Sequence, residues 1–282
     1  MLRTRIGLST STTRSRTDFL LSSLLAGLAL AAWPAVATQT IVLPIVGDAH
    51  GVNDAWWNVE VRAINRSDVT KHLAVVDWIG TPNWKPTSYD VPPHSTLSVG
   101  GWPFAGGGTE ALAGTAICSV DEGLIVEAAV LTGHWGGAGV RPCWSYEGGY
   151  VLCVGPVGAG PIIEGLAFTP ANQETFLPWL HTVFTHRTNL SLTNPDVMPA
   201  HVTVAITSED GTVSQSADYD VPAHGIIQIN DLFSMEPWTA IRTANTFANA
   251  GATAIIKSDT RLLALAYVIS NENNSLTISV PH

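Results

Sequence analysis

Apolar and polar residues alternate in many short runs after residue 37 of the 282-residue chain. In the run 57–64, Trp57, Val59 and Val61 occupy alternate positions, and polar residues fill most of the positions between them. A period of two is typical of a strand with one buried and one exposed face. Long apolar stripes with the 3.6-residue period of a helix are absent from this part of the sequence. The pattern therefore predicts an all-β fold.

The alternating runs fall into two groups. The first group comprises the runs 40–43, 57–64, 73–79, 88–91, 96–99, 115–120 and 124–132. The second group comprises the runs 175–177, 188–193, 202–208, 215–221, 226–229, 252–257, 262–270 and 276–280. About seven short strands at this spacing, separated by turn residues, are typical of an immunoglobulin-like β-sandwich. Between two of the later runs, residues 230–234 predict a capped helical turn.

A duplicated segment relates the two groups. Tyr-Asp-Val-Pro-Pro-His at 89–94 returns as Tyr-Asp-Val-Pro-Ala-His at 219–224, displaced by 130 residues. Asn65 is echoed by Asn194 in the same way. Such an echo indicates tandem copies of one structural unit. We therefore predict two tandem immunoglobulin-like β-sandwich units.

The first 37 residues have the features of a secretory signal peptide. Four Arg residues accompany an apolar run at 19–33, and Ala35-Val36-Ala37 follows as a small-x-small cleavage site. The run has 15 residues, fewer than the roughly 20 that a membrane-spanning helix needs. We expect cleavage before Thr38 and a mature protein that is extracellular, periplasmic or held at the cell surface.

These features divide the chain into four expected segments. They are a signal peptide at 1–37, a first β-sandwich unit at 38–134, a Gly/Pro-rich hairpin insertion and linker at 135–173, and a second β-sandwich unit at 174–282. No second stretch of the sequence is long and apolar enough to predict a membrane span.

The charge of the chain disfavours nucleic acid as a partner. Removing residues 1–37 takes away four Arg and one Asp, so the formal net charge changes from −10 to −13. An acidic protein repels phosphate backbones and anionic membrane surfaces, and no basic stripe remains after cleavage. The acidity itself needs no more explanation than solubility outside the cell.

Several short motifs carry a resemblance to a known kind of protein. They are Leu177-Pro178, the run His-Arg-Thr-Asn-Leu at 186–190, Thr193-Asn194-Pro195, Asp210-Gly211 and Val-Pro-Ala-His-Gly at 221–225. This pattern resembles a tandem β-sandwich repeat found in secreted proteins of soil and environmental bacteria. The first unit departs from it at Arg66, where the pattern has Pro, and at Trp56-Trp57, where it has Arg-Thr. The resemblance implies a non-enzymatic extracellular module without catalytic residues.

Three cysteines lie after residue 37. Cys143 and Cys153 bracket a segment of hairpin composition, and in an oxidising compartment we predict that they form a disulfide worth about 2–3 kcal/mol. Cys118 aligns with Ile256 in the repeat, so we expect it to be a buried free thiol. Without a Cys-x-x-Cys motif, the three cysteines are a poor zinc site.

The nine histidines do not form a metal-binding motif. His94 and His224 end the two copies of the duplicated segment, and His72 corresponds to His201. A feature kept in both copies of a repeat is more simply structural, so we expect these residues to serve turn geometry. The sequence predicts no metal site and no cofactor.

Motifs of catalysis are also missing from the sequence. It has neither a Gly-x-Ser-x-Gly nucleophile elbow nor a glycine-rich phosphate loop followed by Lys-Ser/Thr. We therefore predict that the protein is not an enzyme. A secreted hydrolase with paired carboxylates stays open as a second alternative, because four glutamates could converge. They are Glu110, Glu122, Glu127 and Glu147.

Tryptophans crowd the first unit. Trp84, Trp102 and Trp135 lie in Gly- and Pro-rich segments and have no counterpart in the second unit. Exposed tryptophan rings bind sugar rings or protein surfaces. Such rings also cover the ends of a small core, and this interpretation stays open. These three residues are the candidate ligand-binding residues, with a polysaccharide or another surface protein as the candidate partner.

The leading hypothesis from the sequence is therefore a secreted, non-catalytic β-sandwich protein that acts as an extracellular adhesion, structural or interaction module. The alternative is a carbohydrate-binding protein that uses the loop tryptophans of the first unit.

Overall fold

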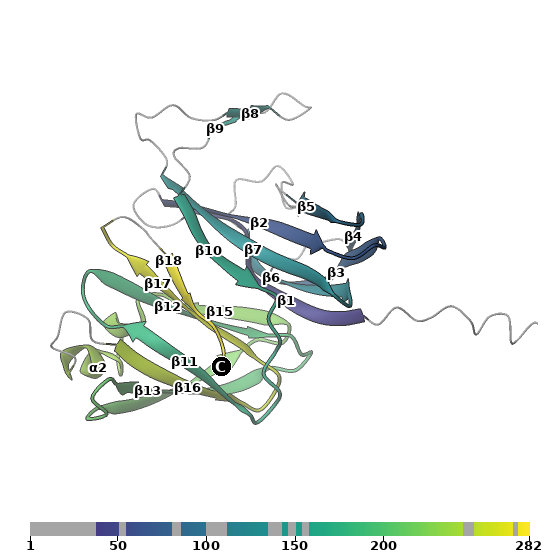
Figure 1. Cartoon of the computed structure of the whole chain (residues 1–282). Coiled ribbons are helices and arrows are strands. Elements are labelled where there is room, and N and C mark those ends of the chain that lie inside the picture. Colours follow the sequence, from purple (N-terminus) through teal and green to yellow (C-terminus); the bar gives the residue numbers. More distant parts are fainter. Residues whose placement is uncertain are drawn as a thin grey trace, which may run out of the picture. The chain divides into compact units, whose positions relative to one another are not determined.

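Strands account for almost all of the regular structure (Figure 1). The computed structural model describes residues 38–50, 55–80, 86–99, 112–134, 143–145, 151–153, 158–244, 251–272 and 276–282. Within these residues the helical elements are a 3₁₀ turn, η1 (Leu232–Ser234), and one short helix, α2 (Thr239–Ala244). The predicted all-β sandwich fold is confirmed. The immunoglobulin-like topology stays a prediction, and the expected signal peptide lies outside the described residues.

The first half of the described chain forms one eight-stranded antiparallel sheet. Its strands are β1 (Thr38–His50), β2 (Ala55–Asn65), β3 (Lys71–Ile79), β4 (Thr87–Val91), β5 (Ser95–Val99), β6 (Leu112–Asp121), β7 (Leu124–His134) and β10 (Gly158–Glu164). They follow the order β10-β7-β2-β1-β6-β3-β4, and β5 also pairs with β2. The two strands β8 (Cys143–Ser145) and β9 (Val151–Cys153) pair only with each other among the described strands.

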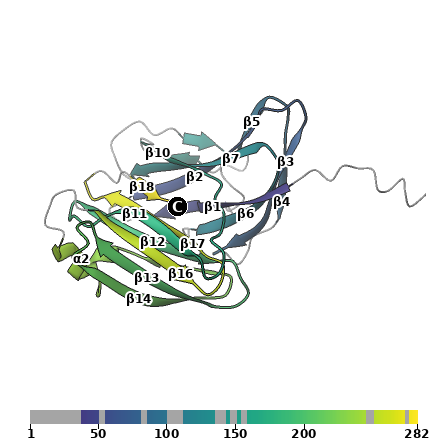
Figure 2. The ribbon, with the colours of Figure 1, turned by 60° about the horizontal axis from the view of Figure 1, so that its bottom comes forward.

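The second half forms two four-stranded sheets. Its strands are β11 (Glu174–His181), β12 (His186–Asn194), β13 (Ala200–Ser208), β14 (Ser214–Val221), β15 (Gly225–Ile229), β16 (Gly251–Ser258), β17 (Leu263–Ser270) and β18 (Leu276–Ser279). One sheet has the order β11-β16-β13-β14 and the other has the order β15-β12-β17-β18. Figure 2 turns the bottom of Figure 1 forward and shows β13, β14 and β16 side by side.

The two halves share one arrangement of strands. The series β1-β6-β3-β4 matches β11-β16-β13-β14, and β10-β7-β2-β5 matches β18-β17-β12-β15. In the first half the end of β1 also pairs with β2, with Asp48 opposite Asn58, and this pairing joins the two layers into one sheet. β10 lies inside the segment that the sequence predicts as insertion and linker. Its Gly- and Pro-rich composition hides a strand that pairs with β7.

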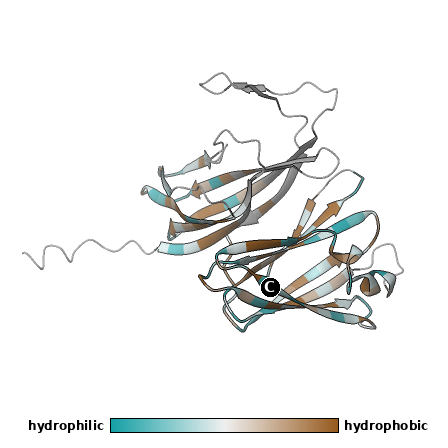
Figure 3. Ribbon diagram, turned by 180° about the vertical axis from the view of Figure 1, so that it is seen from behind, coloured by the Kyte–Doolittle hydropathy of each residue, from teal (hydrophilic) through white to brown (hydrophobic). Residues whose placement is uncertain are grey.

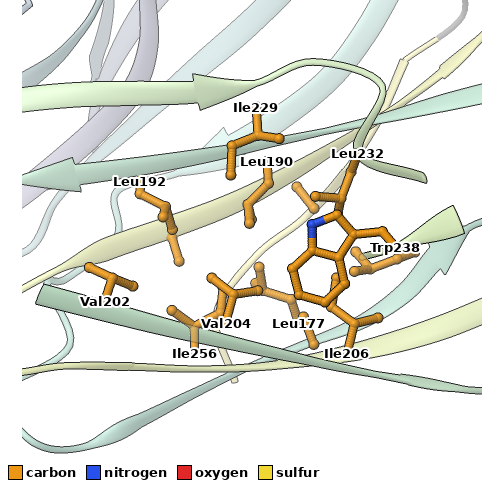
Figure 4. Close-up of a cluster of buried hydrophobic side chains, with 14 of the residues drawn as sticks. Leu177, Leu190, Leu192, Val202, Val204, Ile206, Ile229, Leu232, Trp238 and Ile256 are labelled. Carbon is orange, nitrogen blue, oxygen red and sulfur yellow. The ribbon is translucent and has the colours of Figure 1, made fainter. Parts of the chain in front are cut away.

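The core of the second half lies between its two sheets. Every second residue of β13 is buried from Ala200 onward, as the alternating pattern predicts. Figure 3 shows the same alternation as brown and pale segments along the strands. In Figure 4, Leu190 and Leu192 of β12 point toward Val204 of β13, and the indole of Trp238 fills the space at one end. Burying each such side chain stabilises the fold by about 1.5–3 kcal/mol.

β17 is buried at all eight of its residues, unlike the alternating strands. Continuous burial is typical of a strand that is covered on both faces. Ala264 and Ala266 belong to the core of the second half. Leu263 and Leu265 belong to a separate apolar cluster that includes Val42 of β1. The outward side of β17 is therefore covered by Val42 of the first half together with Leu166 and Phe168 of the segment that joins the halves.

A polar contact accompanies this apolar cluster. The hydroxyl oxygens of Thr115 in β6 and Thr193 in β12 lie 3.3 Å apart, and both side chains are buried. Nearby, His224 Nε2 lies 3.4 Å from a carboxylate oxygen of Asp77 in β3. Residues 38–282 thus belong to one compact unit.

One buried asparagine holds the same turn in each half. Asn194 Nδ2 donates to the carbonyl oxygens of Met198 at 2.8 Å and Pro222 at 3.1 Å. Its Oδ1 accepts the backbone N–H of Asp196 at 2.9 Å. Asn65 makes the corresponding bonds to Val69 at 2.8 Å, Pro92 at 3.0 Å and Ser67 at 2.9 Å. The echo of these residues in the sequence therefore marks a structural role.

The duplicated segment ends in a left-handed turn residue in both halves. His94 has φ 51° and His224 has φ 48°. The backbone N–H of His94 donates to the carbonyl oxygen of Ser67 at 3.3 Å, and that of His224 donates to Asp196 at 2.7 Å. These bonds tie the turn to the loop that Asn65 or Asn194 holds.

We predict that Asn194→Ala lowers the free energy of unfolding by about 3 kcal/mol, because it leaves buried carbonyl groups without a donor and each such group costs about 1–3 kcal/mol. Asn230 is exposed in the same half, so Asn230→Ala is the control and should change stability by less than about 0.5 kcal/mol. Urea unfolding of both variants measures the difference. A loss below about 1 kcal/mol for Asn194→Ala contradicts the role assigned to this residue.

The pairing of β8 and β9 generates a second prediction. Cys143 lies directly opposite Cys153 in this antiparallel pair. Opposite residues have Cα atoms about 4.5–5.5 Å apart, which falls within the range that a disulfide spans. We predict that peptide mapping without reduction finds Cys143 linked to Cys153. A disulfide that includes Cys118, or two free thiols at 143 and 153, contradicts it.

Candidate functional site

The tryptophans proposed from the sequence as ligand-binding residues, Trp84, Trp102 and Trp135, lie outside the described residues, so their role stays a prediction. Trp78 of β3 is 2% exposed and belongs to the core of the first half. Gly114 of β6 makes room for its ring, because a Cβ at this position would lie 2.4 Å from Trp78 Nε1. At least one of the clustered tryptophans therefore packs the fold.

The glutamates of the hydrolase alternative are only partly described. Glu110 and Glu147 lie outside the described residues. Glu122 is exposed in the turn after β6, and Glu127 lies in β7 opposite Arg62 of β2 and Glu164 of β10. Strand pairing therefore places Glu127 between Arg62 and Glu164 in the sheet.

The cysteine that the sequence expects to be buried is buried. Cys118 of β6 is a free thiol in the core of the first half, with Ile41 and Val75 as its partners in the neighbouring strands. Burial raises the pKa of the Cys118 thiol to about 12. A thiol with this pKa is protonated at neutral pH and is a poor nucleophile.

The duplicated histidines each contact one aspartate. His72 Nδ1 lies 2.7 Å from Asp90 Oδ1, and His201 Nδ1 lies 2.5 Å from Asp220 Oδ1. These are the same contact in the two halves, between the start of one strand and the edge strand beside it. Within the described ranges, no group of three or more His, Cys, Asp or Glu side chains is placed to hold a metal ion.

Three exposed apolar residues of the second half, Phe176, Trp179 and Ile255, lie on the outward side of the β11-β16-β13-β14 sheet, whereas the others lie in loops. We call this side the outer face, and its residues are Phe176, Trp179, Ala205, Thr207, Gly251, Thr253 and Ile255. Phe176 and Ile255 are register partners, and each is 42% exposed. Outward residues of a solvated sheet are normally polar, so exposed rings here indicate a contact surface.

Trp179 is the most unusual residue of the outer face. It is 68% exposed and sits in a bulge of β11 with φ 60°. A bulky residue at positive φ is a conformational outlier that costs about 1–3 kcal/mol. Gly251 lies beneath the ring, because a Cβ at that position would be 3.4 Å from Trp179 Cε3. The backbone of β16 therefore supports the exposed ring.

Hydroxyl groups continue the outer face beside Trp179. Thr253 is paired with Thr207, which is paired with Ser214 of β14. Thr207 Oγ1 and Ser214 Oγ lie 3.0 Å apart. At the end of this row a carboxylate oxygen of Glu209 accepts the backbone N–H of Gly251 at 3.0 Å. The outer face thus combines a rigid aromatic ring with a short row of neutral hydroxyls.

A pair of histidines borders the outer face. His181, opposite Gly251 in the strand ladder, and His186 of β12 have ring centroids 5.1 Å apart. Burial lowers the pKa of His181, and a second imidazolium at His186 lowers it further. In the loop between them, Phe184 is exposed, and the guanidinium of Arg242 lies 5.1 Å from the centre of its ring.

The sequence did not single out the outer face. Its signal was Phe176 in the edge strand 174–181, at a position that alternation would leave polar. Trp179 lies three residues further on, where alternation would place it inward, and it faces outward because of the bulge after Leu177. Hydrophobic patterning also does not predict the left-handed backbone conformation of Trp179.

Comparisons with known proteins identify no family for this chain. No family model matches the sequence, and no curated protein is significantly similar to it. In the described part of the chain, no helix has the length and apolar character needed to cross a membrane.

The histidine pair predicts a pH dependence. Because the pKa of His181 is lowered in the folded protein, its contribution to stability is present above its unfolded value near 6.5 and is lost as the pH falls through the folded value. We predict that stability falls with acidification in this window. His181→Asn should remove that part of the dependence, as measured by urea unfolding across the pH range.

His186→Gln is the matched variant for this prediction. It removes the second imidazolium, so the pKa of His181 should rise toward its ordinary value, and an NMR titration of the His181 ring reports it. A His181 pKa that is at or above its ordinary value in the wild-type protein contradicts the prediction.

Proposed function

We propose that this chain is a secreted, non-catalytic β-sandwich protein that acts as an extracellular adhesion, structural or interaction module. The observation that carries the proposal is the outer face, on which Phe176, Trp179 and Ile255 are exposed side by side on a rigid sheet. Export is supported by the basic and apolar pattern of residues 1–37 and by the cleavage motif before Thr38.

The roles of the repeated polar residues support a non-catalytic function. Asn65 and Asn194 are engaged with backbone groups, and His72 and His201 each contact an aspartate. The asparagines hold turns, and the histidines pair with aspartates across neighbouring strands, so these shared residues serve the fold. The second half differs in that Phe176 is exposed where the first half has the buried Val42, and exposed apolar residues suit contact with another surface.

Carbohydrate binding is the second candidate function. The exposed ring of Trp179 beside the hydroxyls of Thr253 and Thr207 favours it, because an aromatic face and neutral hydroxyls are the groups that sugars contact. In this alternative Trp84, Trp102 and Trp135 would add rings from the first half.

Fractionation of bacterial cells that express the full chain tests the proposal. We expect protein outside the cytoplasm that begins at Thr38 and sediments with isolated cell envelopes or with a purified surface polymer. Leu24→Arg interrupts the apolar run of the signal peptide and is the control, because it should keep the protein in the cytoplasm with Met1 or the uncleaved segment. Cytoplasmic wild-type protein, or exported protein that neither surface material nor another copy of the chain retains, contradicts the proposal.

A further inference from the structure

The outer face has a counterpart in the first half at the same strand positions. Phe176 pairs with Ile255, and Val42 pairs with Ile117 in the equivalent strands. In both halves a Leu-Pro pair follows and the register then shifts, after Leu177 in β11 and after Pro44 in β1. The two surfaces are therefore built on the same backbone plan.

In the first half this surface is already an interface. Val42 is 1% exposed and packs in the cluster with Leu263 and Leu265 of β17. Thr115, on the same side of the sheet, is buried and contacts Thr193 of β12. The outward side of β1-β6-β3 therefore docks on the outward side of β12 and β17.

The outer face keeps the chemistry of that interface, and its large apolar side chains, Phe176, Trp179 and Ile255, are exposed. Thr253 stands at the position of Thr115, and Ile255 stands at the position of Ile117, so two of the residues are identical. Phe176 stands at the position of Val42, has a larger side chain and is 42% exposed. The protein thus carries two copies of one docking surface, and among the residues that the structure describes only the copy on β1 is covered.

The same plan indicates what can cover the second copy. The first surface covers β12 and β17, whose equivalents in the first half are β2 and β7. The outward positions of β2 and β7 include the register partners Ile64 and Ile125. They are equivalent to Thr193 and Leu263, which are register partners in the second half. In a second molecule, β12 and β17 are already covered by its own first half. The equivalent surface that remains is the outward side of β2 and β7.

We propose that the outer face of one molecule docks on the outward side of β2 and β7 of a second copy, head to tail, so that the packing of the two halves continues between molecules. The proposal rests on the proposed function as an interaction module and names a second copy of the chain as the partner. Trp179 anchors the contact, because exposed tryptophans carry a large share of interface energy. A head-to-tail contact between unlike surfaces leaves a free surface at each end of the pair, so it generates closed rings or open chains of molecules.

Sedimentation velocity of the mature chain 38–282 from micromolar to near-millimolar concentration tests the proposal. We expect the weight-average mass to rise with concentration. Trp179→Ala and Ile255→Arg on the outer face should each weaken association at least about tenfold. Phe184→Ala is the matched control, because Phe184 is exposed in a loop beside the outer face, and it should change association less than about twofold.

Mixing two variants distinguishes head-to-tail docking from a symmetric dimer. Ile255→Arg blocks the outer face, and Ile125→Arg blocks the β2-β7 surface, so neither variant should associate alone. Their mixture should form a one-to-one complex, because each retains the surface that the other lacks. Thermal unfolding checks that each variant is folded, and Arg62→Glu replaces Ile125→Arg if the latter does not fold.

A wild-type chain that stays monomeric at the highest concentration overturns the inference, as does association that Ile255→Arg and Trp179→Ala leave unchanged. A mixture that does not associate, although the wild type does, replaces head-to-tail docking by a symmetric contact and also overturns it. Binding of a polysaccharide to the outer face of a monomeric chain overturns it in favour of the sugar-binding alternative. In that case the proposed function still stands if the exported protein is retained by a surface polymer.

Discussion

The continuous burial of β17 is the constraint on which the arrangement of this protein depends. One side of the strand, with Ala264 and Ala266, closes the core of the second half. The other side, with Leu263 and Leu265, would expose an apolar surface if the second half stood alone. The first half covers this side through Val42 and Thr115, so the outward side of β12 and β17 is occupied. The free sheet of the second half is the one that carries the outer face.

The duplicated residues and the divergent residues have separate roles. Asn65 and Asn194 make the same set of backbone hydrogen bonds, and His94 and His224 take the same left-handed turn. These features keep two copies of one fold in register. Phe176 stands where the first half has Val42, and with Trp179 it lies where the other copy makes its interface. Duplication thus accounts both for the internal packing and for an exposed surface of the same kind.

Hydrophobic patterning predicted much of this fold because most strands have one buried and one exposed face. It placed β13 and β2 closely, and the echo of Asn65 in Asn194 predicted the tandem arrangement. Patterning predicted a strand at 262–270 but not its covering on both faces, since continuous apolar character does not identify the partner. It missed β10, whose glycines and proline resemble a linker. It also missed the prominence of Trp179, because a bulge and a positive φ depend on the pairing with β16.

Native-state hydrogen exchange in increasing denaturant tests the central claim most directly, namely that the two halves share β17 as a strand covered on both sides. The account predicts that the amides of β1 and β17 exchange slowest and open together, with the same free energy and the same dependence on denaturant. Separate openings, in which β17 exchanges with a lower free energy than β1 and Leu263→Ala affects only the second half, would contradict it.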